Sequence, residues 1–349
     1  MNELLRVEDL TVALPTRSGY AKAVDGMSFA VDTGEVMGIA GESGSGKTIT
    51  ALSLFGLLPL GARVSGSIRL DGIELTSLSG KQLRAVRGRQ IAMVSQDPST
   101  SLHPILPIGT QLIEHMRHHL EVSKDEALIR AAGLLDTVRI PDPEQALRSY
   151  PGQFSGGMRQ RIAIAVALAA EPRLLVADEP TTALDVTVQA GILRLLDRLC
   201  RERGMAVIVI THDLGVMSAT ARRLFVMYAG RLAEAGPTSE LLARPRHPYT
   251  RGLLAAIPRL TAQATEDGSP AIAGDPPSPL RIPAGCRFRT RCPMAQARCE
   301  EEDPALAVSP DDPRHLAACH FAFTPATPAT PATPGAQATP ATAPEAARP

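Results

Sequence analysis

A glycine-rich loop between an apolar run and a helical pattern most constrains what this chain can fold into. Residues 41–48 read Gly-Glu-Ser-Gly-Ser-Gly-Lys-Thr, with the run Val-Met-Gly-Ile-Ala before them and a helical pattern over 48–58 after them. Glycines at these spacings let backbone N–H groups wrap phosphates, and the dipole of the following helix adds positive potential. The order of strand, glycine loop and helix therefore predicts a phosphate-binding loop in an α/β fold.

The lysine and threonine that close this loop carry its expected chemistry. A glycine, four residues, then glycine, lysine and threonine form the Walker A pattern. We expect Lys47 to contact the β- and γ-phosphates and Thr48 to ligate Mg²⁺. The rest of the phosphate cradle is then the loop itself: Gly41, Glu42, Ser43, Gly44, Ser45 and Gly46. The alternative, a glycine turn without a ligand, does not account for the flanking strand and helix.

Two acidic residues end a second apolar run. Leu-Leu-Val-Ala at 174–177 is followed by Asp178 and Glu179, as in a Walker B segment. We expect Asp178 to hold Mg²⁺, directly or through water, and Glu179 to orient or deprotonate the attacking water. Two acids at a strand end are often only solvated surface, but that interpretation is disfavoured downstream of a Walker A loop.

Residues 154–158, Phe-Ser-Gly-Gly-Met, resemble the signature of ATP-binding cassette (ABC) ATPases, usually written LSGGQ. Phe154 replaces the usual Leu, and Met158 replaces the usual Gln. The hydroxyl of Ser155, the backbone of Gly156 and Gly157 and the start of an apolar helix remain, and these suffice to hold a γ-phosphate. A Ser-Gly-Gly cluster can also be a simple helix cap, so its position just before the Walker B strand decides the interpretation.

Three single residues extend the set of motifs. Gln96, in Val-Ser-Gln-Asp-Pro, matches the Q-loop glutamine, and Asp185, after Ala183 and Leu184, matches the D-loop. His212 follows the apolar run 206–210 and matches the switch histidine, although a polar residue at a strand end is the plainer alternative. With these motifs in order over residues 20–215, the chain resembles the ABC ATPases.

The resemblance implies an ABC-type P-loop NTPase: an antiparallel β-subdomain, a RecA-like core and a helical subdomain at about 97–165. It implies that Gln96 senses Mg²⁺ and the water, that His212 contacts the γ-phosphate, and that Asp185 lies across a dimer interface. Two subunits would sandwich two ATPs head to tail, each site completed by residues 155–158 of the opposite chain. Tyr20 is the candidate for the aromatic that stacks on adenine.

Three segments resemble the ATPase subunits of dipeptide, oligopeptide and nickel importers in particular. They are Glu-Pro-Thr-Thr-Ala-Leu-Asp-Val-Thr-Val-Gln-Ala at 179–190, His-Pro-Tyr-Thr at 247–250, and Gly-Cys-Arg-Phe-Arg-Thr-Arg-Cys-Pro at 285–293. We therefore expect an ATPase that energises uptake of dipeptides or oligopeptides, with nickel as the alternative solute. The resemblance implies two permease chains, a second ATPase (a paralogue or a second copy) and, indirectly, a solute-binding protein.

Composition divides the chain into three parts. The ABC ATPase domain is expected over 1–243, a transporter-specific extension rich in Pro, Arg and Cys over 244–323, and a disordered tail of repeated Thr-Pro-Ala over 324–349. Pro and small polar residues bury too little apolar area to offset ordering entropy, hence the last assignment.

Four cysteines lie in the extension: Cys286, Cys292, Cys299 and Cys319, with intervening lengths of 5, 6 and 19. Structural zinc sites usually contain short C-x(2–4)-C pairs, and none occurs here. Four cysteines can also ligate a [4Fe–4S] cluster, although the ferredoxin spacing is absent. Members of the resembled subfamily carry such a cluster, which favours iron–sulfur. Zinc and unligated thiols stay open. The fifth, Cys200, extends the apolar face of the helix expected over 188–203 and is predicted to be core.

Charge and hydropathy limit the partners. Acidic and basic residues balance at 36 each, and aromatics make up 3%, so neither a basic surface nor base-stacking platforms favour nucleic acid. No signal peptide and no apolar run of 18 residues are visible, so we expect a cytosolic protein held peripherally at the cytoplasmic face of the membrane.

The sequence disfavours two other classes of ABC protein. A soluble ABC protein of translation or repair usually has two cassettes or a coiled-coil insertion, whereas here about 110 residues separate Walker A from the signature. A regulator with a degenerate cassette is disfavoured because Lys47, Asp178, Glu179 and His212 are all intact.

Overall fold

The computed structural model of the protein describes residues 2–180, 185–257 and 272–323. Two β-sheets form its body. The smaller sheet is antiparallel, in the order β2-β1-β4-β5. Its strands are β1 (Glu3–Thr16), β2 (Gly19–Asp32), β4 (Arg63–Leu70) and β5 (Ile73–Glu74). Apolar side chains that alternate with more exposed residues along β1 and β2 are buried on one face of this sheet.

The larger sheet has the strand order β11-β12-β10-β9-β3-β8-β7-β6. Its parallel part contains β6 (Ile91–Val94), β7 (Leu174–Asp178), β8 (Ala206–Thr211), β3 (Val36–Ala40) and β9 (Arg223–Tyr228). Every residue of β3, β7 and β8 is buried. These runs are apolar almost throughout because parallel strands are covered on both faces. The α/β prediction is confirmed.

One face of the parallel strands packs against the antiparallel sheet and α1 (Lys47–Leu54), and the other against the helices that follow. The helix after the glycine loop is shorter than the predicted 48–58. It ends at Leu54 because the chain turns through Gly56, whose φ is +58°, and Pro59 follows soon after.

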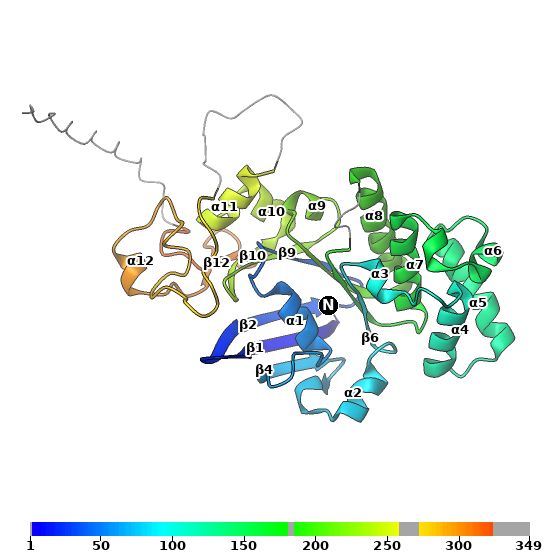
Figure 1. Cartoon of the computed structure of the whole chain (residues 1–349). Helices are drawn as coiled ribbons and strands as arrows, with labels where there is room; N and C mark the ends of the chain where they lie inside the picture. Colours follow the sequence, from blue (N-terminus) through cyan, green and yellow to red (C-terminus); the bar gives the residue numbers. More distant parts are fainter. Residues whose placement is uncertain (1, 181–184, 258–271, 324–349) are drawn as a thin grey trace, which may run out of the picture.

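A separate group of helices lies at the opposite end of the molecule from α12 (Figure 1). It contains α4 (Ile108–His119), α5 (Lys124–Thr137), α6 (Pro143–Arg148) and α7 (Gly156–Leu168), with the turn η2 (Pro151–Gln153) between α6 and α7. Helix α3 (Pro98–Ser101) leads into the group from β6, while η1 (Leu75–Ser77) and α2 (Gly80–Val86) connect β5 to β6. Three helices, α4 to α6, thus occupy much of the range of about 97–165 that is expected for the helical subdomain. Helix α8 (Val186–Arg203) buries Cys200 in the core, also as predicted.

The C-terminal extension is joined to the sheet of the ATPase core. After α9 (Leu214–Met217), β10 (Arg231–Pro237) and α10 (Thr238–Ala243), it contains α11 (Pro248–Ala255), α12 (Arg298–Glu301), β11 (Ala307–Val308) and β12 (Leu316–Ala317). Strand β12 pairs with β10, at Glu234 and Ala235, so the extension continues the larger sheet. The tail predicted over 324–349 and D-loop residues 183 and 184 lie outside the described residues. None of the helices in the described ranges has the length and hydropathy needed to cross a bilayer.

Candidate functional site

Glycines shape the phosphate-binding loop between β3 and α1. Gly41 and Gly46 have φ values of +150° and +105°. A Cβ at Gly41 would lie 2.3 Å from the carbonyl oxygen of Met227, and one at Gly46 would lie 2.6 Å from that of Ala23. No side chain caps α1, and its first turn holds no acidic residue, so the positive end of the helix faces the loop.

Lys47 lies beneath the loop that it closes. Its Nζ donates hydrogen bonds to the carbonyl oxygens of Gly41 (2.7 Å) and Glu42 (2.9 Å), and the residue is 5% exposed. Burial lowers the pKa of Lys47, an effect that the charges of Glu179, Asp178 and Glu42 oppose. An ammonium buried beneath the loop can bind an anion. The nearby carboxylates would repel a bare anion, so they favour one that is itself bound to a cation.

Asp178, the last residue of β7, lies in a buried environment beside the phosphate-binding loop. Burial raises the pKa of Asp178, opposed by a hydrogen bond with the Thr48 side chain. Among the residues that the structure describes, Asp178 Oδ1 and Ser45 Oγ are buried and have no hydrogen-bond partner. A buried carboxylate oxygen next to a threonine hydroxyl fits the oxygen ligands that Mg²⁺ prefers. These residues therefore fit the metal that accompanies a nucleotide.

Glu179 lies between the two other predicted catalytic residues. Its Oε2 accepts a hydrogen bond of 3.0 Å from the Gln96 amide, and its Oε1 lies 3.3 Å from His212 Nδ1. Glu179 adopts a positive φ of +46°, a conformation that non-glycine residues rarely take and that is enriched at functional sites. Three residues from three separate motifs thus meet around one carboxylate.

The loop and this trio line a common pocket of about 770 Å³. Its lining includes Glu42, Ser43, Gly44, Gly46, Lys47, Thr48, Gln96, Glu179 and His212. Leu14, Ala23 and Ile49 complete the apolar part, and Pro279 of the extension also lines the pocket. Sequence reasoning did not identify Pro279, because no motif marks it.

Other predicted site residues do not line this pocket. Ser155 caps α7 by accepting a bond of 3.3 Å from Met158 N, and Asp185 caps α8 by accepting one of 2.9 Å from Val188 N. Gly156 and Gly157 form the first turn of α7. Tyr20 is half-exposed, with the Arg63 guanidinium 3.9 Å from its ring centroid. Roles for these residues at a nucleotide stay predictions.

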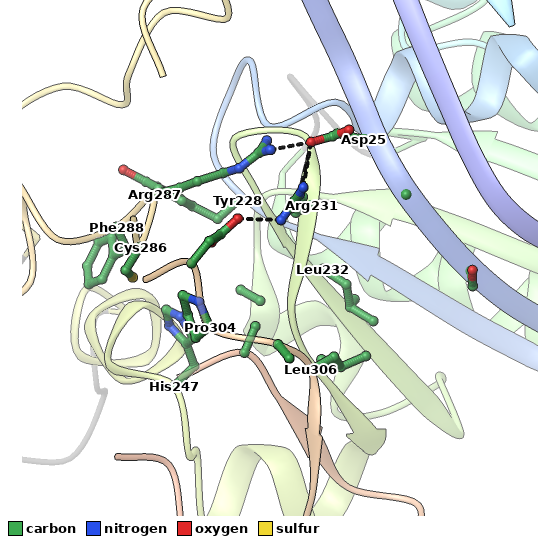
Figure 2. A pocket seen from close by; sticks show the side chains of 16 residues that line it. Asp25, Tyr228, Arg231, Leu232, His247, Cys286, Arg287, Phe288, Pro304 and Leu306 are labelled. Carbon is green, nitrogen blue, oxygen red and sulfur yellow. Dashed lines mark hydrogen bonds and ion pairs between the residues drawn. The ribbon is translucent and has the colours of Figure 1, made fainter. Parts of the chain in front are cut away.

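Salt bridges fix the extension to the core beside a second cavity, of about 350 Å³ (Figure 2). Asp25 on β2 is paired with Arg231 of β10 and with Arg287 of the extension, and Arg287 also donates to the carbonyl oxygen of Ala229 at 2.6 Å. Burial alone would raise the pKa of Asp25, but hydrogen bonds from Lys22 and Arg287 and the charge of Arg231 lower it to about 2. Asp25 is therefore ionised at neutral pH and holds both arginines.

The four cysteines of the extension line one narrow cavity, together with Phe288, His320 and Phe321. Burial raises the pKa of three thiols, those of Cys286, Cys292 (to about 11) and Cys319. Within the described ranges, however, no three His, Cys, Asp or Glu side chains form a group that could hold a metal ion. The thiols are gathered, but they are not arranged as ligands.

Two family models match the chain. Residues 24–182 match the model described as ABC transporter, and residues 233–299 match that described as oligopeptide/dipeptide transporter, C-terminal region. The oligopeptide transport ATP-binding protein OppD of Salmonella typhimurium is 46% identical over 91% of this chain and 93% of its own. The probable peptide ABC transporter ATP-binding protein y4tR of Sinorhizobium fredii is 49% identical over 90% and 94%.

Solved structures show the same architecture. The dimeric ATP-binding cassette MJ0796, bound to ADP and Pi, superposes with a TM-score of 0.61 at 27% identity and covers 67% of this chain and 99% of its own. The protein cbiO1 from Clostridium perfringens, part of the ABC transporter complex cbiONQ, has a TM-score of 0.60 at 28% identity, with 70% and 92% covered. The predicted antiparallel subdomain, core and helical subdomain are all present.

Proposed function

The chain belongs to the family of ABC transporter ATP-binding proteins, and from this premise we propose that it is the ATP-hydrolysing subunit that powers a peptide importer. Its C-terminal region matches the oligopeptide/dipeptide transporter model, and relatives similar over nine-tenths of the chain are named as peptide import or oligopeptide transport proteins. Dipeptides or oligopeptides are the proposed cargo, and nickel is the alternative. The proposed domains remain 1–243, 244–323 and the tail 324–349.

The observation that carries the ATPase chemistry is Glu179 held between Gln96 and His212 in the pocket of the glycine loop. In the proposed reaction Glu179 takes a proton from the attacking water, while Gln96 and His212 fix the carboxylate and, through it, the water. Lys47 and the loop amides hold the β- and γ-phosphates. Thr48 and Asp178 would hold Mg²⁺, which would neutralise phosphate charge.

We propose that the second half of each ATP site comes from another ATPase subunit. Ser155 to Met158 stand at the start of α7 and outside the pocket of their own chain, so they are placed to serve a partner's nucleotide. Asp185 is assigned to the contact between the two subunits. Because Ser155 caps α7 and two glycines form the start of the helix, the backbone N–H groups there can donate hydrogen bonds to phosphate oxygens. The partner is a paralogue or a second copy.

The transporter assignment requires two permease chains, which would place this subunit peripherally at the cytoplasmic face of the membrane. The test is affinity purification of the chain from detergent-solubilised membranes of its own organism. We expect two permease subunits and an ATPase partner in stoichiometric amounts. Purification with ribosomes and without any membrane protein would instead support a soluble ABC protein of translation.

We also propose that Cys286, Cys292, Cys299 and Cys319 hold a [4Fe–4S] cluster, with zinc as the alternative. Support comes from the donor set, since four thiols line one cavity and iron–sulfur clusters take four cysteines. Thiolates are the ligands, and burial raises the pKa of three of these thiols, so binding of the cluster would release protons. Binding would also require the four side chains to rearrange, since they are not arranged as ligands. Its role would be structural, joining a segment with little secondary structure.

If the cluster is present, protein purified without oxygen will be brown, absorb at about 400 nm and contain stoichiometric iron and sulfide. Cys292→Ser should lose most of the iron, whereas Cys200→Ser, a buried thiol outside the extension, should keep it. Metal analysis that finds zinc alone would exclude the iron–sulfur proposal, and protein without bound metal would leave the cysteines as free thiols.

A further inference from the structure

Two side chains of the extension contact the phosphate-binding loop directly. The backbone N–H of Glu42 donates a hydrogen bond of 2.7 Å to the Oη of Tyr249, on α11. The guanidinium of Arg291 binds the Glu42 carboxylate through both of its oxygens, at 2.6 and 2.9 Å. One residue of the Walker A loop is therefore held at its backbone and at its side chain by a segment outside the ATPase motifs.

The side chains that make both contacts, Tyr249 and Arg291, are buried. Tyr249 is 0% exposed, and its ring packs on Tyr228 and Phe288 at centroid distances of 4.6 and 5.5 Å. Burial raises the pKa of Tyr249, so its hydroxyl stays a neutral acceptor. The side chain of Arg291 is 4% exposed and touches the hydroxyl of Tyr228 at 3.4 Å. Figure 2 shows Tyr228 and Phe288 close together beside the second cavity.

The charge of Glu42 gives these contacts a function. Glu42 lines the nucleotide pocket, and a free carboxylate there would repel the phosphates of a bound nucleotide. The Arg291 fork cancels that charge and fixes the direction of the carboxylate, because paired N–H donors match a carboxylate geometrically. Tyr249 then fixes the backbone of the same residue. The amides that follow in the loop are thereby kept in one conformation.

We propose that Arg291 and Tyr249 are positioning residues for the ATP site, and that the extension sets nucleotide affinity through Glu42. The inference rests on the ATP-binding function stated above. It also assigns a role to the segment between Cys286 and Cys292. This segment reaches the core twice, with Arg287 on Asp25 and with Arg291 on Glu42. Removal of either contact to Glu42 should weaken nucleotide binding without changing the residues that perform hydrolysis.

The test measures binding of a fluorescent ADP with Mg²⁺ to the full-length chain. Arg291→Met should weaken binding by about tenfold, because the released Glu42 charge faces the phosphates. Adding Glu42→Gln to Arg291→Met should recover most of that loss. Recovery distinguishes charge cancellation from a general loosening of the extension, which a second substitution in the loop would not repair.

Tyr249→Phe removes only the hydroxyl and should weaken binding by about threefold to tenfold, the range of one hydrogen bond. The matched control is Arg314→Met, since Arg314 also forms a two-pronged pair, with Asp312, but on the exposed surface of the extension. It should bind ADP like the unaltered chain. Circular dichroism and thermal midpoints establish that each variant is folded.

Wild-type affinity in folded Arg291→Met and Tyr249→Phe would overturn the inference. So would a double variant, Glu42→Gln with Arg291→Met, that binds no better than Arg291→Met alone. If Arg291→Met does not fold, Tyr249→Phe and Arg291→Lys, which keeps the charge but loses the fork, decide the question. Failure of the unaltered chain to bind MgADP and MgATP would instead contradict the ATPase function itself.

Discussion

Glu179→Gln is expected to reduce ATP turnover by roughly two to four orders of magnitude while leaving ATP binding intact. The substitution keeps the size and hydrogen-bonding capacity of the side chain, so contacts to Gln96 and His212 can persist. It removes the base that accepts the proton of the attacking water. Steady-state phosphate release and equilibrium binding of MgATP measure the two quantities separately.

The variant should also accumulate as a closed ATP-bound dimer if, as we propose, ATP binding drives association of two ATPase subunits and hydrolysis reverses it. Size-exclusion chromatography with MgATP, together with the partner ATPase, detects this species. Glu202→Gln on α8 is the control for loss of one surface carboxylate and should hydrolyse ATP normally. A normal rate in Glu179→Gln would show that another group is the general base.

Lys47→Ala is expected to weaken MgATP binding by roughly 30- to 300-fold, which corresponds to the loss of about 2 to 3.4 kcal/mol from charge-assisted bonds. Lys47 is 5% exposed beneath the loop, so no other ammonium can take its position without rearrangement. The variant also loses the two bonds that tie Lys47 to the carbonyls of Gly41 and Glu42. Isothermal titration calorimetry with MgATP measures the change.

Lys81→Ala, on the exposed start of α2, provides the matched loss of a lysine and should bind ATP normally. Thermal unfolding without nucleotide checks that Lys47→Ala retains the fold. A folded Lys47→Ala chain with unaltered affinity would contradict the assignment of the phosphate contact to this lysine.

The sequence predicted the catalytic half-site because its parts obey local rules. Apolar runs at 36–40, 174–178 and 206–210 are buried strands, and parallel strands bring the residues after their carboxyl ends to the same edge of the sheet. Glycine spacing fixes the loop between strand and helix. Motif order therefore predicts the roles of Gln96, Glu179 and His212, and the structure brings the three residues together in one pocket.

The contacts of the extension could not be predicted in this way. Arg291 and Glu42 are separated by 249 positions, and neither belongs to a periodic segment that would indicate a partner. An arginine in a stretch rich in Pro and Arg gives no signal about which carboxylate it will meet. Pro279 lines the nucleotide pocket for the same non-local reason. Only the folded path of the extension across the core brings these residues to the loop.

The cysteines are an intermediate case. Their number together with the family resemblance predicted a cluster, and all four do line one cavity, yet spacing alone does not determine ligand geometry. Similarly, the boundary drawn at residue 243 from composition does not foresee that β12 pairs with β10. Composition identifies where regular periodicity stops, but it does not indicate which sheet edge the following segment joins.

The most direct test of the account is ATP hydrolysis by the full transporter, reconstituted in vesicles with its permeases, partner ATPase and solute-binding protein. With a mixture of dipeptides and oligopeptides on the receptor side, we predict that hydrolysis rises and labelled peptide enters the compartment that contains ATP. The same complex with Glu179→Gln should do neither. Hydrolysis that is unaffected by peptide but stimulated by nickel would contradict peptide import as the function.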